Sequence, residues 1–117
     1  MSFLKKIIFL KILLLLSFIQ ITKADTKLLM LTDKKCMYCI VWEKQIGEIY
    51  NKTEISSAYP LKRYEASEIN ENFKNKIFKT NITPTFVFFN NGKEVGRIIG
   101  YSNPEMFWWQ VDEILEK

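Results

Sequence analysis

Two cysteines, Cys36 and Cys39, are separated by Met37 and Tyr38, and they are the only cysteines in the 117-residue sequence. At the start of a helix, this spacing places the first sulfur beside backbone N–H groups that lack a helical partner and at the positive end of the helix dipole. Such a setting lowers the pKa of a cysteine from about 8.5 to roughly 3.5–7.5, which favours the nucleophilic thiolate. The second sulfur lies close enough to attack a mixed disulfide formed by the first. The pattern predicts thiol–disulfide exchange in which Cys36 attacks and Cys39 resolves.

The residues next to this motif allow other interpretations to be weighed. Lys34 and Lys35 precede Cys36 and are expected to stabilise its thiolate.

A permanent structural disulfide is the main alternative to thiol–disulfide exchange. A bridge across two residues closes only a small loop, however, and contributes little to the stability of the fold in the chain-entropy picture. Zinc needs four ligands, so it would require sharing between chains. Covalent haem attachment needs a histidine after the second cysteine, and Ile40 stands there.

The composition excludes several classes of function. The chain has no histidine, so a Ser-His-Asp triad, an imidazole base and a His-ligated metal are all excluded. The 17 basic residues exceed the 13 acidic ones only because the first 24 residues carry Lys5, Lys6, Lys11 and Lys23 and no acidic residue. The remainder is neutral and shows no basic stripe, which argues against nucleic-acid binding. We expect no metal and no cofactor other than the cysteine pair itself.

Residues 1–24 have the three-part layout of a secretory signal peptide. A basic start is followed by the apolar stretch Ile7–Ile21 and by the small residue Ala24, where cleavage is expected. An uncleaved membrane anchor, with the lysines on the cytoplasmic side, is the alternative. In both cases residues 25–117 are exported as one domain, and we expect a periplasmic location.

The hydrophobic pattern of residues 25–117 alternates between the periods of strands and helices. Large aromatic side chains are expected to dominate the core, namely Trp42, Phe86, Phe88, Phe107 and Trp108. Gly96 is expected to serve a bulge or a close approach. The predicted strands are 28–32, 61–64, 85–89 and 94–99, the predicted helices are 37–50, 70–80 (with Asn70 as N-cap) and 104–115, and 53–59 is predicted to be a loop.

Pro84 stands immediately before the apolar strand 85–89, where a proline is unusual unless it marks a special turn. An ordinary trans-proline at the start of a strand is the alternative. Together with the strand, Cys-x-x-Cys and helix that precede it, Thr83-Pro84-Thr85 resembles the cis-proline loop of the thioredoxin-like family. The resemblance implies an α/β fold with a central mixed sheet flanked by helices (βαβαββα). It also implies that Met37, Tyr38, Thr83 and Pro84 bind an extended substrate.

Within that family, the sequence is similar to the small periplasmic thioredoxins of sulfur-oxidation (Sox) clusters. This resemblance implies a monomeric reductase that acts on disulfides of a sulfur-carrier protein and receives electrons from a membrane thiol transporter. The segments that carry it, besides the cysteine motif, are 42–47, 59–61, 82–87 and 92–101.

One departure from ordinary thioredoxins affects the chemistry expected of Cys39. Thioredoxins carry a buried aspartate six residues before the first cysteine, and Met30 occupies that position here. Proton removal from Cys39 would then use water or another group, of which Glu43 is one candidate. Three alternative functions also remain: a disulfide-introducing oxidase, a reductase of cytochrome c maturation, and a non-enzymatic docking module with a permanent Cys36–Cys39 disulfide.

Overall fold

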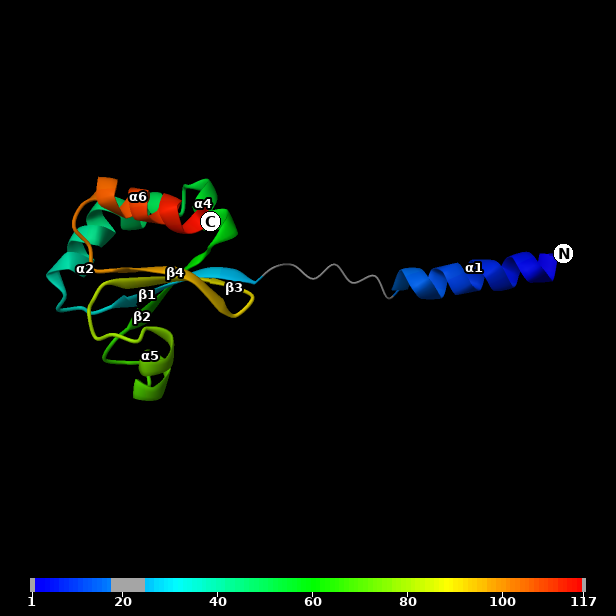
Figure 1. Cartoon of the computed structure of the whole chain (residues 1–117), viewed down its shortest axis with the longest axis horizontal. Coiled ribbons are helices and arrows are strands. Elements are labelled where there is room, and N and C mark those ends of the chain that lie inside the picture. The colour runs from blue at the N-terminus through cyan, green and yellow to red at the C-terminus, as the bar shows by residue number, and fades with distance from the viewer. Residues whose placement is uncertain (1, 18–24, 117) are drawn as a thin grey trace.

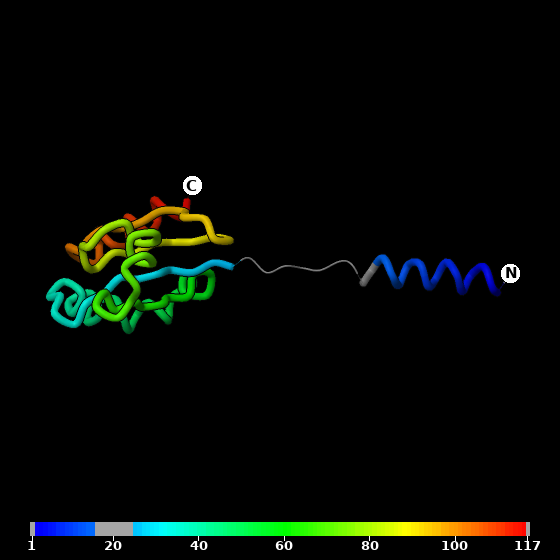
Figure 2. Tube along the Cα trace, turned by 90° about the horizontal axis from the view of Figure 1, so that it is seen from below, coloured from blue at the N-terminus to red at the C-terminus, as the bar shows by residue number. Residues whose placement is uncertain are grey.

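The computed structural model describes residues 2–17 and 25–116, and residues 25–116 build a four-stranded sheet with helices on both faces (Figures 1 and 2). The strand order is β2-β1-β3-β4. β1 runs parallel to β2 and antiparallel to β3, and β3 pairs antiparallel with β4. The mixed sheet confirms the predicted fold class. The strands are β1 (Thr26–Thr32), β2 (Leu61–Glu65), β3 (Thr85–Asn90) and β4 (Lys93–Ile99).

Helices of unequal extent cover the two faces of the sheet. In Figure 1, α2, α4 and α6 lie on one side of the sheet and α5 on the other. The first helical stretch after β1 is continuous, with one π-helical turn in its middle. The elements are α2 (Met37–Trp42), the π-helix η1 (Glu43–Gly47), α3 (Glu48–Tyr50), α4 (Glu54–Ala58), α5 (Glu71–Ile77) and α6 (Pro104–Leu115).

Two predicted segments differ from the structure by more than one or two residues at an end. The loop predicted over residues 53–59 is wrong, because Thr53 caps a short helix there by accepting a hydrogen bond from the Ser56 amide at 3.3 Å. Asn70 caps α5 as predicted, but this helix ends at Ile77 instead of continuing to residue 80. Its end is set by Lys79, whose φ of 57° is left-handed and cannot continue a right-handed helix.

The β3–β4 hairpin closes through a turn at Asn91 and Gly92. Asn91 and Gly92 have φ of 53° and 79°, so both adopt the positive values that a tight hairpin turn requires. Gly96 on β4 provides a close approach, because a Cβ there would lie 2.8 Å from Cγ2 of Ile114 in α6. The last helix therefore packs directly against the backbone of β4.

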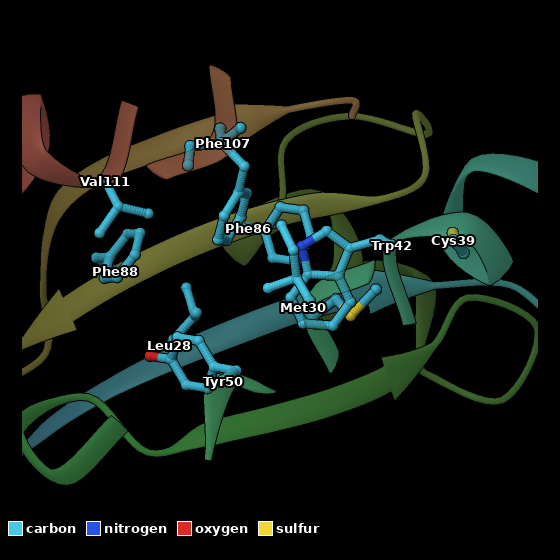
Figure 3. Close-up of a cluster of buried hydrophobic side chains, with 11 residues drawn as sticks. Leu28, Met30, Cys39, Trp42, Tyr50, Phe86, Phe88, Phe107 and Val111 are labelled. Carbon is cyan, nitrogen blue, oxygen red and sulfur yellow. The ribbon is translucent and has the colours of Figure 1, made fainter. Parts of the chain in front are cut away.

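The larger hydrophobic cluster lies between the sheet and helices α2 and α6, and we call this side the α2/α6 face (Figure 3). The Trp42 ring lies 4.9 Å from that of Phe86 and 5.8 Å from that of Phe107, between ring centroids. Four of the five predicted core aromatics are fully buried; the fifth, Trp108, is half-buried and stacks on Tyr50. The buried members of the cluster are Leu28, Met30, Cys39, Trp42, Ile46, Tyr50, Phe86, Phe88, Ile98, Phe107 and Val111.

A smaller cluster lies on the opposite side, which we call the α5 face. Its buried members are Leu29, Leu31, Phe78, Val87 and Phe89. The half-buried Tyr64, Phe73 and Ile77 pack against them. These three side chains also line an open cavity of about 150 Å³. Helix α5 therefore covers its face of the sheet incompletely.

The N-terminal stretch forms helix α1 (Ser2–Ser17). None of the helices in the described ranges 2–17 and 25–116 combines the length and the apolar character needed to cross a membrane. The predicted cleavage site after Ala24 lies outside the described residues.

Candidate active site

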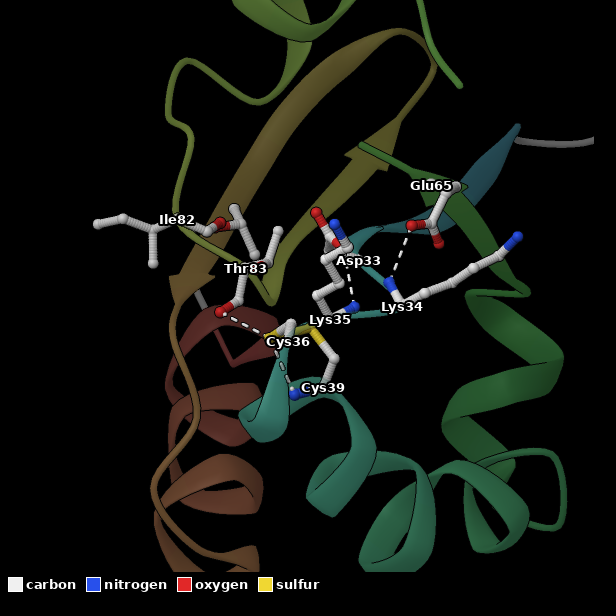
Figure 4. Close-up of a disulfide and its surroundings, with 9 residues drawn as sticks. Asp33, Lys34, Lys35, Cys36, Cys39, Glu65, Ile82 and Thr83 are labelled. Atoms are coloured by element: carbon white, nitrogen blue, oxygen red, sulfur yellow. Dashed lines mark hydrogen bonds between the residues drawn. A yellow bond between two sulfur atoms is a disulfide. The ribbon is translucent and has the colours of Figure 1, made fainter. Parts of the chain in front are cut away.

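A compact turn after β1 delivers the first cysteine to the start of α2. The Asp33 carbonyl accepts a hydrogen bond from the Cys36 amide at 3.0 Å, and the Asp33 carboxylate accepts one from the Lys35 amide at 2.9 Å. The Glu65 carboxylate, at the end of β2, accepts one from the Lys34 amide at 2.8 Å (Figure 4). The turn is therefore fixed both by its own aspartate and by the neighbouring parallel strand.

Cys36 is the N-cap of α2 and is bonded to Cys39 in a disulfide. The Cys36 backbone is extended, with φ of −83° and ψ of 110°, and its sulfur accepts a hydrogen bond from the Cys39 amide at 3.1 Å. The Cα atoms of the two cysteines are 5.2 Å apart. When the disulfide is reduced, the same amide is placed to stabilise negative charge on the Cys36 sulfur.

The segment before β3 brings a backbone carbonyl to this sulfur. The carbonyl oxygen of Thr83 lies 3.2 Å from Cys36 Sγ (Figure 4). The Thr83–Pro84 peptide bond is cis. A reduced Cys36 thiol can donate a hydrogen bond to this oxygen, whereas the Cys39 amide favours the thiolate. The Cys39 amide therefore favours the thiolate form of Cys36, and the Thr83 carbonyl favours its thiol form.

The two sulfurs differ in accessibility. Cys39 is only 2% exposed and belongs to the α2/α6 cluster, while Cys36 is half-buried at the edge of that cluster. An external nucleophile or disulfide can therefore reach Cys36 far more readily than Cys39. The attacking role of Cys36 and the resolving role of Cys39 stay predictions, and this asymmetry is compatible with them.

Of the four residues predicted to contact substrate, Met37, Tyr38 and Thr83 are at least partly exposed, and Pro84 is buried. Met37 and Tyr38 are 68% and 63% exposed on the first turn of α2, and Thr83 and Pro84 lie on the opposing segment. Their roles in substrate binding stay predictions. Ile82, next to Thr83 in the chain, is 54% exposed and was not singled out from the sequence.

Both lysines predicted to stabilise the thiolate have exposed side chains. The Lys34 side chain extends away from the disulfide in Figure 4, and its ammonium lies 3.7 Å from Glu68 Oε1. The Lys35 side chain is exposed and has no ion-pair partner among the described residues. The contacts seen at the Cys36 sulfur are therefore backbone groups, and the electrostatic role of the lysines stays a prediction.

The surroundings of Cys39 are apolar. Met30 is fully buried in the same cluster as Cys39 and Trp42, as Figure 3 shows. The Glu43 carboxylate accepts hydrogen bonds from Nε and Nη2 of Arg63 at 2.6 and 2.9 Å. Accepting a proton from Cys39 would require Glu43 to give up part of this pairing, and its role as a proton acceptor stays a prediction.

Several residues around the site were not found by sequence reasoning. The hydroxyl of Thr85, which is fully buried, donates to the Ile82 carbonyl at 2.7 Å and so shapes the segment that carries Thr83. Asp33 and Glu65 fix the turn before Cys36 through their side chains. Asp33 could have been found from its place three residues before Cys36, whereas Glu65 reaches the turn from another strand and left no local signal in the sequence.

No three potential metal-ligating side chains gather in the part of the chain that the structure describes.

Comparisons with known proteins agree with this architecture. A family model described as a thioredoxin-like domain matches residues 18–115. Among solved structures, the reduced periplasmic thioredoxin SoxS of Paracoccus pantotrophus is 26% identical with a TM-score of 0.66, and the match covers 79% of this chain and 97% of that chain.

Other thioredoxins share the fold at lower identity. The thioredoxin of Trypanosoma brucei brucei is 22% identical, with a TM-score of 0.62 and coverage of 79% of this chain and 76% of that chain. The thioredoxin of Malassezia sympodialis is 17% identical, with a TM-score of 0.63 and coverage of 75% of both chains. The comparison with curated proteins gave no match. With its family match, its mixed sheet and its Cys36–Cys39 pair at the start of α2, this chain belongs to the thioredoxin-like family and has the fold of a thiol–disulfide oxidoreductase.

Proposed function

We propose that this protein is an exported reductase of protein disulfides in which Cys36 attacks and Cys39 resolves. One observation carries the proposal: the more accessible sulfur of the pair caps α2 and faces the Thr83 carbonyl, while its partner is buried behind it. This arrangement offers a substrate a single sulfur to react with and keeps the second within reach of the first.

The reaction consists of two exchanges that balance in atoms and electrons. In the reduced protein, the Cys36 thiolate attacks one sulfur of a substrate disulfide, and the other substrate sulfur leaves as a thiolate. The Cys39 thiol then loses its proton and attacks the Cys36 sulfur, which releases the second substrate thiolate and forms the Cys36–Cys39 disulfide. The substrate gains two electrons and the protein loses two. A dithiol donor must return them before the next cycle.

The proposed compartment and partners rest on the leader and on similarity. Residues 1–24 would export the domain to the periplasm, either as a cleaved signal peptide or as a retained anchor. A periplasmic thioredoxin, SoxS, resembles the chain over nearly its own full length. We therefore propose a sulfur-carrier protein as substrate and a membrane thiol-electron transporter as donor, with the domain acting as a monomer.

Trapping of the mixed disulfide tests the proposal directly. In a Cys39→Ser variant the resolving sulfur is absent, so substrates should remain bonded to Cys36 and be recovered from the periplasm under non-reducing conditions. The Cys36→Ser variant is the matched control and should capture nothing. Recovery of a sulfur carrier supports the proposed substrate, and recovery of cytochrome c maturation proteins favours that alternative. If Cys39→Ser captures no protein, the disulfide is a permanent element of a docking module.

The direction of electron flow needs a separate measurement. Equilibration of the protein with defined ratios of reduced and oxidised glutathione gives its reduction potential. A reductase should lie toward the thioredoxin end of a range from about −270 to about −120 mV. A potential near the upper end would instead make the protein an oxidase that introduces disulfides.

The leader can be tested on the exported protein. N-terminal sequencing of material from the periplasmic fraction should begin at Asp25 if the peptide is cleaved after Ala24. Recovery of the full-length chain in the membrane fraction would identify residues 1–24 as an anchor. Recovery of the domain in the cytoplasm alone would contradict export.

A further inference from the structure

The segment of residues 79–84, between α5 and β3, carries the only backbone carbonyl seen against the Cys36 sulfur in the described residues. We call it the Pro84 segment. A displacement of this segment moves the Thr83 carbonyl relative to the sulfur, so the contacts that fix its two ends determine the geometry of the site.

The end nearest β3 is fixed by hydrogen bonds from the sheet. The Gly100 amide, just after β4, donates to the Pro84 carbonyl at 2.8 Å. The buried Thr85 hydroxyl donates to the Ile82 carbonyl at 2.7 Å, and the Thr80 hydroxyl oxygen accepts from the Ile82 amide at 3.1 Å. The first two bonds tie this end to β4 and β3, and the third lies within the segment itself.

At the other end, one side chain from β4 binds two backbone carbonyls. Arg97 donates from Nη2 to the Ile77 carbonyl at 3.0 Å and from Nη1 to the Phe78 carbonyl. Carbonyls at a helix C-terminus lack helical partners, and a cation there interacts favourably with the helix dipole. Arg97 thus binds the last carbonyls of α5 where the Pro84 segment begins.

Glu94 orients this guanidinium. Its Oε2 accepts from Arg97 Nε at 2.8 Å, and its Oε1 accepts from Nη2. The side chains of Arg97 and Glu94 are 19% and 30% exposed, so solvent screens this pair less than a fully exposed one. The planar guanidinium can bind the carboxylate and two carbonyls at once, which a lysine ammonium cannot do with the same geometry.

Packing beneath α5 does not fix the helix as firmly. The helix has seven residues, and its side chains Phe73 and Ile77 line the cavity of about 150 Å³ on the α5 face. Because a cavity leaves its lining without partner atoms on one side, apolar contacts hold this helix less tightly than a filled core would. Where α5 meets the Pro84 segment, the polar contact from Arg97 thus adds to the burial of Phe78 and to the hydrogen bond that the Lys79 amide donates to the Lys74 carbonyl at 3.1 Å.

We infer that Arg97 is a positioning residue, which holds the Pro84 segment through the carbonyls of Ile77 and Phe78 and thereby sets the Thr83 carbonyl against Cys36. The inference deepens the proposed protein-disulfide exchange and rests on it. A protein substrate must align with the Pro84 segment, whereas a small disulfide needs only the sulfur. Loss of Arg97 should therefore impair the reaction with proteins selectively.

The test compares Arg97→Met with Arg63→Met. Arg63 also pairs through two hydrogen bonds with a glutamate, but on β2 and with Glu43, so it controls for loss of a surface arginine. The substrates are insulin, as a protein disulfide, and 5,5′-dithiobis(2-nitrobenzoate), as a small one. Arg97→Met should lower kcat/KM for insulin roughly tenfold, mainly through KM, and change the rate with the small disulfide by less than about twofold. Arg63→Met should leave the ratio of the two reaction rates within about twofold of that of the unchanged protein, because releasing Glu43 from its arginine would alter the resolving step for both substrates alike.

A second measurement does not depend on activity. Hydrogen exchange of the Gly100 amide reports its bond to the Pro84 carbonyl, and it should be faster in Arg97→Met than in Arg63→Met. Equal exchange in the two variants overturns the inference, and so does an equal loss of activity toward both substrates. If Arg97→Met does not fold, Glu94→Gln and Arg97→Lys should give smaller increases in the insulin KM, and an unchanged KM in both overturns the inference. If the unaltered protein reacts with the small disulfide but not with insulin, the proposed function fails while the exchange measurement still decides the inference.

Discussion

On the α2/α6 face, the rings of Trp42, Phe86 and Phe107 contact one another in a fully buried cluster, whereas on the α5 face an open cavity remains beside Phe73 and Ile77. The two halves of the active site come from these two faces. The cysteines belong to the helix on the densely packed face, and the Thr83 carbonyl follows the helix on the sparsely packed one. The comparison teaches that Cys39 is held by dense packing, whereas the carbonyl opposite Cys36 follows a sparsely packed helix and depends more on hydrogen bonds from β3 and β4.

The largest expected effect compares one phenylalanine on each face. Phe107 and Phe78 are both buried, but Phe107 contacts the rings of Trp42, Phe86, Tyr101 and Trp108, and Phe78 only those of Tyr64 and Phe73. Phe107→Ala should lower the free energy of unfolding toward the upper end of about 3–5 kcal/mol and Phe78→Ala toward the lower end. Urea unfolding of the oxidised proteins measures both. A larger loss for Phe78→Ala would contradict the comparison.

A substitution that adds volume to the densely packed face should also be costly. Gly96→Val places side-chain atoms where Ile114 of α6 already lies, so helix α6 must shift. We expect a loss of about 1–3 kcal/mol in the free energy of unfolding. Val95→Ala, at the exposed neighbouring position, is the control and should cost less than about 0.5 kcal/mol. If Gly96→Val is as stable as the control, the contact between α6 and β4 is looser than described.

The two faces can also be compared by the rate at which Cys39 resolves a mixed disulfide. Met30→Asp introduces a carboxylate into the cluster that contains Cys39, beside Arg63, its partner in the β1–β2 register. A nearby base should speed proton removal from Cys39, so the resolving step should accelerate roughly tenfold at neutral pH. Stopped-flow release of the second thionitrobenzoate from 5,5′-dithiobis(2-nitrobenzoate) measures this step.

The matched control for that rate is Leu29→Asp, on the α5 face of the same strand. It should destabilise the fold without accelerating resolution, because the sheet separates it from Cys39. Equal acceleration in both variants would show that the effect comes from loosening of the fold and not from a base near the sulfur.

The smallest expected effect concerns the pH dependence of stability on the α5 face. Hydrogen bonding from Arg97 lowers the pKa of Glu94 below its usual value. A carboxyl group with a lowered folded-state pKa stabilises the fold above its unfolded pKa of about 4.3 and loses that contribution as the pH falls through the folded value. Glu94→Gln should therefore be less stable by up to about 1 kcal/mol near neutral pH. The difference between the two proteins should shrink in acid, as urea unfolding at several pH values can show. A constant difference would mean that Glu94 acts by packing alone.

Much of the fold was predictable because its signals are local. The alternation of strand and helix periods predicted the strands, the long helix after Cys36 and helix α6. Asparagine followed by glycine readily adopts the positive φ values that the turn at Asn91 and Gly92 has. Helix α4 was missed because its five residues are too few to show a period. Its only sequence signal was a capping threonine at position 53.

The site was predictable to the extent that it depends on neighbours in sequence. The cysteine pair and the Pro84 turn could be read from short motifs, but contacts between distant segments could not. Lys34 was expected near the sulfur because it is two residues away, yet its ammonium pairs with Glu68. Arg97 contacts carbonyls about 20 residues earlier in the chain, and backbone acceptors leave no trace in the sequence.

The burial of Cys39 behind Cys36 also constrains how the protein meets its partners. Because only one sulfur of the disulfide can be approached from outside, the molecule that supplies electrons and the molecule that receives them must occupy the same surface, one after the other. The two cannot dock simultaneously. The domain would therefore carry electrons by leaving one partner before joining the next, and tight binding to either would slow the whole cycle.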